Sequence, residues 1–103
     1  MIRQRLANRR ASASFDFEAQ GMRQTATYSK FPYGRLAELF VSNHKPGSQA
    51  DANARDAAVV CSLALQHGVP LDTIRRALLR DARGNSATPV GTALDLTAAE
   101  DAR

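Results

Sequence analysis

Three segments in the first half of the chain alternate between apolar and polar residues, which is the pattern of half-buried β-strands. Phe15 and Phe17 alternate with acidic residues and predict a strand over residues 14–19. Residues 22–30 alternate again and are rich in threonine, so they predict a second strand. Residues 35–42 predict a third strand, and because this segment is the most apolar we expect it to be central.

The hydrophobic period changes to that of a helix after Pro46 and Gly47. Ser48 is a good N-cap residue, and the small apolar residues that follow it at helical spacing predict a helix over residues 49–67. A proline then opens a second predicted helix over residues 70–83. Another proline, Pro89, starts a short third helix, predicted at about residues 90–99.

Strands followed by helices predict the α+β class, with a three-stranded antiparallel meander and two or three helices packed on one of its faces. We expect residues 1–13 to form a basic N-terminal arm and residues 14–103 to form a single domain. A three-stranded sheet has two edges, and exposed edges pair readily with other chains. The sequence therefore predicts a homo-oligomer.

Composition narrows the class of protein. The formal net charge of the 103 residues is +4, and arginine supplies most of the positive charge. Arginine suits phosphate or carboxylate partners. The sequence has no long apolar run and no apolar leader, so we expect no membrane association. The single cysteine, Cys61, fits a reducing compartment and predicts a cytoplasmic protein. The sequence contains no motif for a cofactor, no spacing typical of metal ligands and no recognisable catalytic triad, so we expect no cofactor and no metal.

The loop ahead of the first predicted helix combines a lysine, a serine hydroxyl and a helix N-terminus. These groups together favour the binding of a phosphate or another anion. We therefore predict that a nucleotide or another phosphate-bearing small molecule binds there. The predicted binding residues are His44, Lys45 and Ser48, with Arg9 and Arg10 of the arm.

A second interpretation is a helix–turn–helix. Ala64, Gly68 and Ile74 have the spacing of the packing and turn residues in such units. The second helix would then enter the major groove of DNA, and the basic arm would follow the minor groove. The residues that would contact DNA are Thr73, Arg76, Arg80 and Arg5.

Several stretches, taken in order, point to a known family. The longest reads Gly-Arg-Leu-Ala-Glu-Leu-Phe-Val-Ser-Asn-His-Lys-Pro-Gly-Ser over residues 34–48, and shorter ones occupy residues 8–12, 15–18, 56–60, 62–70 and 84–95. From about Leu6 to Asp95 the chain resembles the C-terminal (TSCPD-type) region of adenosylcobalamin-dependent ribonucleoside-diphosphate reductase.

The resemblance implies ancestry but not catalysis. The family reaction needs a thiyl cysteine and a reducing cysteine pair in a large barrel, whereas this chain has only Cys61. The family's catalytic residues have no positions to be carried onto, so we expect the chain alone not to reduce ribonucleotides. Three functions stay open: a non-catalytic module that binds or sequesters a nucleotide or assists a reductase, a DNA-binding protein, and a protein–protein adaptor without a small ligand.

Overall fold

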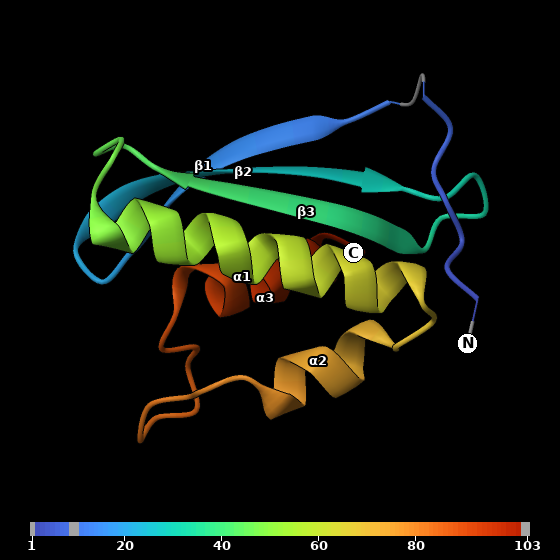
Figure 1. Ribbon diagram of the computed structural model, residues 1–103. Coiled ribbons are helices and arrows are strands. Elements are labelled where there is room, and N and C mark those ends of the chain that lie inside the picture. Colours follow the sequence, from blue (N-terminus) through green and yellow to red (C-terminus); the bar gives the residue numbers. More distant parts are fainter. Residues whose placement is uncertain (1, 9–10, 102–103) are drawn as a thin grey trace.

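The computed structural model describes residues 2–8 and 11–101. An antiparallel sheet, with the strand order β1–β2–β3, is followed by three helices, which confirms the predicted α+β fold (Figure 1). α1 and α3 pack against the sheet, and α2 lies in an outer position where it contacts α3. The elements are β1 (Ala13–Ala19), β2 (Met22–Lys30), β3 (Leu36–Asn43), α1 (Gln49–Gln66), α2 (Leu71–Ala77) and α3 (Pro89–Asp101).

The strands and the first helix lie within about one residue of their predicted bounds. The β1–β2 turn consists of Gln20 and Gly21, which both have positive φ angles, of 50° and 70°. Such a two-residue turn matches the twist of the two strands it joins. The third helix begins at Pro89 as predicted, and the Thr88 hydroxyl accepts a hydrogen bond from the backbone N–H of Gly91.

The predicted second helix is too long. α2 ends at Ala77, because Leu78 has extended backbone angles (φ −78°, ψ 154°). Beyond it, the carboxylate of Asp81 accepts hydrogen bonds from the backbone N–H groups of Arg83 and Asn85, at 2.9 and 3.1 Å. Aspartate side chains that bond nearby backbone in this way compete with helix formation. The stretch that we predicted to be the end of a basic helix is therefore a tight turn.

The expectation that the third strand is central is also wrong, because β2 is central and β3 lies at an edge. β3 is nevertheless buried along most of its length, since α1 runs alongside it in the opposite direction (Figure 1). Ser62 donates a hydrogen bond to the carbonyl of Leu39 and accepts one from its N–H, both at 2.9 Å. Gln66 donates to the carbonyl of Ala37. Side chains of α1 thus take the place of a fourth strand.

We expect Ser62→Ala to lower the free energy of unfolding by about 1–3 kcal/mol, because it leaves both backbone groups of buried Leu39 without this partner. Chemical denaturation measures the change. Ser14→Ala is the matched control. The Ser14 hydroxyl contacts Thr27 on the exposed face of the sheet, so its loss should change the free energy of unfolding by about 0.5 kcal/mol or less. Equal effects of the two variants would contradict the importance assigned to the β3 edge.

One buried amide is unsatisfied. Gln24 lies on the central strand and is fully buried, and within the described part of the chain neither of its side-chain polar atoms has a hydrogen-bond partner. Burying a polar group without a partner costs free energy. Gln66 is also buried, but it donates to Ala37 and its side-chain oxygen accepts from Arg3. The two glutamines therefore provide a natural comparison.

Replacing Gln24 with methionine should raise the free energy of unfolding by about 1–3 kcal/mol, because it removes the unsatisfied amide and keeps most of the volume. The same replacement at Gln66 should lower it, since Gln66→Met breaks hydrogen bonds to the edge of β3 and to the arm. Urea denaturation of both variants tests the pair. A destabilised Gln24→Met variant would mean that this amide stabilises the fold.

Candidate functional site

A carboxylate of the protein itself, that of Asp51, occupies the loop before α1. The carboxylate of Asp51, in the first turn of α1, accepts hydrogen bonds from the backbone N–H of Asn43 and from Nε of Arg55, both at 2.9 Å. The Asn43 N–H is the main cause that lowers the pKa of Asp51, and Arg55 adds to it. A side chain of the chain itself therefore places a negative charge beside the predicted anion site, and the binding of an external anion there stays a prediction.

The structure brings three of the predicted anion-binding residues together in this loop. The Ser48 hydroxyl is the N-cap: it accepts from the N–H of Asp51 at 3.1 Å and donates to the carbonyl of Lys45 at 2.8 Å. His44 is exposed, and its Nε2 lies 2.7 Å from the hydroxyl of Thr25. Lys45 is exposed as well. The other two predicted residues, Arg9 and Arg10, lie outside the described residues.

The candidate DNA-binding residues do not share one helix face. Thr73 and Arg76 lie exposed on α2, which has only seven residues and is therefore roughly 10 Å long. Arg80 lies beyond the end of α2, and Arg5 lies in the arm. This arrangement offers a shorter and less basic surface than the predicted helix of residues 70–83.

Arg80 is instead part of an ion-pair network that joins the end of α2 to α3. Its guanidinium donates to both carboxylate oxygens of Asp95, at 2.9 Å each, and Nε of Arg75 donates to the same carboxylate at 2.8 Å. The pKa of Asp95 is lowered, chiefly by the hydrogen bonds from Arg80. The network fixes the turn after α2 against α3.

An apolar groove of about 720 Å³ lies between α1, the α2 segment and the start of α3. Ala57, Val60 and Ala64 line it from α1, and Ile74 and Leu78 line it from the other side. The side chain of Val60 is 67% exposed, so a large apolar group faces solvent here. The sequence analysis missed this groove, although the alanines of the first helix were a signal that its surface is shallow.

Cys61 also lines the apolar groove, but its thiol is not set up as a nucleophile. The residue is buried, and burial raises the pKa of the thiol to about 11. A thiol with such a pKa stays protonated at neutral pH, whereas reactive cysteines need a lowered pKa. Cys61 therefore contributes apolar surface.

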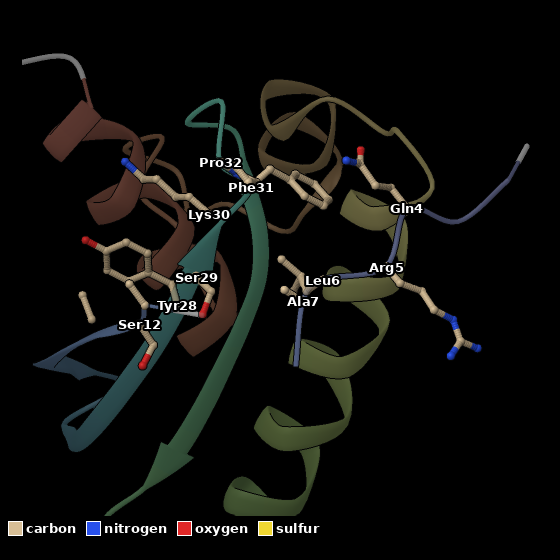
Figure 2. A pocket seen from close by; sticks show the side chains of 12 residues that line it. Gln4, Arg5, Leu6, Ala7, Ser12, Tyr28, Ser29, Lys30, Phe31 and Pro32 are labelled. Carbon is tan, nitrogen blue, oxygen red and sulfur yellow. The ribbon is translucent and has the colours of Figure 1, made fainter. Parts of the chain in front are cut away.

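A second hollow, of about 710 Å³, lies between the arm and the end of β2 (Figure 2). Arg5, Leu6, Ser12, Tyr28 and Lys30 are among the residues that line it. Lys30 is paired with Asp101, which raises the pKa of the lysine, and Figure 2 shows the side chain of Arg5 directed away from the hollow. The two cations among the described lining residues are therefore not directed at a common ligand.

Among the described residues, no group of three or more histidine, cysteine, aspartate or glutamate side chains is placed to hold a metal ion. No helix of the described chain has the length and apolar character needed to cross a membrane.

The geometry defines a small α+β protein with an apolar groove beside α1. Comparison with curated proteins finds 34% identity over 70 residues with the vitamin B12-dependent ribonucleotide reductase of Agrobacterium fabrum, and 31% over 70 residues with that of Bradyrhizobium diazoefficiens. Each match covers 68% of this chain but only 6% of the reductase. No family model and no solved structure matches the chain.

The chain is thus related to a small region of these reductases. The relation that we inferred from the sequence is supported over 70 residues, whereas the assignment to the C-terminal TSCPD region stays a prediction. Because the chain spans a small fraction of the reductases' length, the similarity does not carry their activity to it.

The Asp51 cluster makes the stability depend on pH. A carboxylate whose pKa is lowered by folding stabilises the protein above its unfolded pKa of about 3.9, and this contribution is lost as the pH falls through the lowered folded value. An asparagine side chain cannot ionise, so we expect Asp51→Asn to be less stable than the native chain near neutral pH and the difference to shrink as the pH falls below about 4. Urea denaturation across this range measures it, and a constant difference would exclude the ionised carboxylate as the cause.

Proposed function

We propose that this protein is a non-catalytic accessory module that binds a vitamin B12-dependent ribonucleotide reductase through its apolar groove. The observation that carries the proposal is the groove of about 720 Å³ beside α1, with the exposed side chain of Val60 at its wall. Exposed apolar surfaces that are hollowed and continuous are typical of binding sites.

The similarity to the reductases supports this choice of partner. The matched stretch is 6% of each reductase, so the related region there is part of a much larger polypeptide. We infer that this chain, as a relative of that region, keeps a surface suited to contacts with the rest of such a polypeptide. The one cysteine of the chain is buried and has a raised pKa, which agrees with a role in binding rather than in thiol chemistry.

We expect Val60→Asp to weaken binding of the purified reductase at least tenfold, because it places a charge in an apolar contact; a tenfold loss corresponds to about 1.4 kcal/mol. Titration calorimetry with the native chain and the variant measures the two dissociation constants. Since Val60 is 67% exposed in the free protein, the variant should fold normally.

Val59→Asp is the matched control for this experiment. Val59 is the adjacent residue on α1, is 47% exposed, and lines a different hollow that includes Phe40 and Arg55. The Val59→Asp variant should bind the reductase with a dissociation constant within about twofold of the native value. Equal loss in both variants would contradict the groove as the binding surface, and the absence of any binding by the native chain would overturn the proposed partner. Reduction of ribonucleotides by the chain alone would overturn the non-catalytic role.

Nucleotide binding at His44, Lys45 and Ser48 stays a second prediction. The exposed ammonium of Lys45 is accessible to a phosphate, but the N–H of Asn43 and the cap hydroxyl of Ser48 are bonded within the loop. The hollow beneath the arm, with Tyr28 and Ser12, is large enough for a small ligand. A thermal-shift series with mono-, di- and cyclic nucleotides, repeated on Lys45→Ala, decides between the two sites.

A further inference from the structure

The two edges of the sheet differ. Side chains of α1 occupy the outer edge of β3, as described above, whereas β1 pairs only with β2. Within the described part of the chain, no backbone hydrogen bond reaches β1 from any segment other than β2. Half of the N–H and C=O groups of an edge strand point away from its sheet and can receive another strand. β1 is therefore the edge at which the sheet can be extended.

The side chains of β1 specify what kind of strand fits. Acidic Asp16 and Glu18 are exposed on the open face, and Phe15 and Phe17 lie on the face that is covered by helices. Phe15 is only partly buried, so it leaves apolar surface at the edge. A strand added along β1 should thus alternate basic residues on one face with apolar residues on the other.

The N-terminal arm of this chain has that alternation. Arg3 and Arg5 alternate with Ile2 and Leu6, so an extended arm presents both arginines on one face and the apolar pair on the other. Ile2 is 94% exposed, and the side chain of Arg5 points outward (Figure 2). The arm of each chain therefore complements the β1 edge in charge and in hydrophobic pattern.

Within its own chain the arm lies elsewhere. The N–H of Gln4 donates to the carbonyl of Gln66 at 2.7 Å, Arg3 donates to the side chain of Gln66, and Tyr33 donates to Gln4. These bonds hold it beside the end of α1 (Figure 1). Residues 8–12 separate the arm from β1, and a connection of five residues can span up to roughly 16 Å. Neighbouring strands lie about 4.8 Å apart, so a connection of this length lets the arm leave its own chain and reach a strand of a second copy.

We propose that residues 2–7 of a second copy add as a strand to β1, and that two copies exchange their arms reciprocally. Direct antiparallel pairing of two β1 strands about Asp16 would place like charges opposite each other, which is unfavourable. Pairing with the arm instead brings Arg3 and Arg5 to the acidic side of the edge. Oδ1 of Asp16 already accepts a hydrogen bond from Thr25, and Oδ2 lies 3.8 Å from Arg23, so Glu18 and the more loosely paired Oδ2 of Asp16 receive the added arginines.

Two charge-reversed variants test the exchange. Arg3→Glu with Arg5→Glu reverses the arm, and Asp16→Lys with Glu18→Lys reverses the edge. Light scattering coupled to size-exclusion chromatography should give twice the chain mass of 11.1 kDa for the native protein and a monomer for each variant alone. Far-UV circular dichroism checks that both variants fold, as expected for exposed positions.

A mixture of the two variants gives the decisive result. Its arms and edges are complementary only between different chains, so the equimolar mixture should recover the dimer mass, and so should a single chain that carries all four reversals. If the arm instead folds back on its own β1, the mixture stays monomeric. That result, a native protein that is monomeric at about 100 µM, or dimers that persist in both variants would each overturn the proposal.

Discussion

Side chains of α1 complete the outer edge of β3, and the rest of the fold depends on this contact. One helical turn of four residues rises about 6 Å, close to the span of about 6.6 Å of two strand residues. Ser62 and Gln66 can therefore reach Leu39 and Ala37 in succession, while Asp51 reaches Asn43 at the other end of the same strand. Three polar side chains thereby fix the position of α1 along β3, and α1 in turn forms one wall of the groove.

The opposite wall depends on a second polar contact. Asp95 of α3 binds the side chains of Arg75 and Arg80, which lie before and after the end of α2. These groups are partly exposed, so their individual contributions are small, but the bidentate geometry of Arg80 gives the contact a defined direction. It keeps Ile74 and Leu78 facing α1, and the groove between them stays open.

A polar contact also connects the loop before α1 to the helix. A helix N-terminus favours negative charge, and here the chain places the carboxylate of Asp51 there. The charge is used to connect β3 with α1. In the apolar groove, by contrast, Val60 stays exposed to solvent within the described part of the chain. An exposed apolar groove is suited to a protein partner, and we propose that this partner is a reductase of the kind to which the chain is related.

Local pattern alone determined the order of the three strands and, within about one residue, their bounds, as well as the N-cap of α1 at Ser48 and the start of α3 at Pro89. Alternation, capping and proline act within a few residues. The end of α2 was not determined in this way, since the side chain of Asp81 and the pairing of Arg80 with Asp95 compete with the helix. The apolar sequence of β3 suggested a central strand, whereas β3 is an edge strand that α1 buries. Which face, edge or groove a residue occupies was decided only by tertiary packing, because those contacts join residues far apart in the sequence.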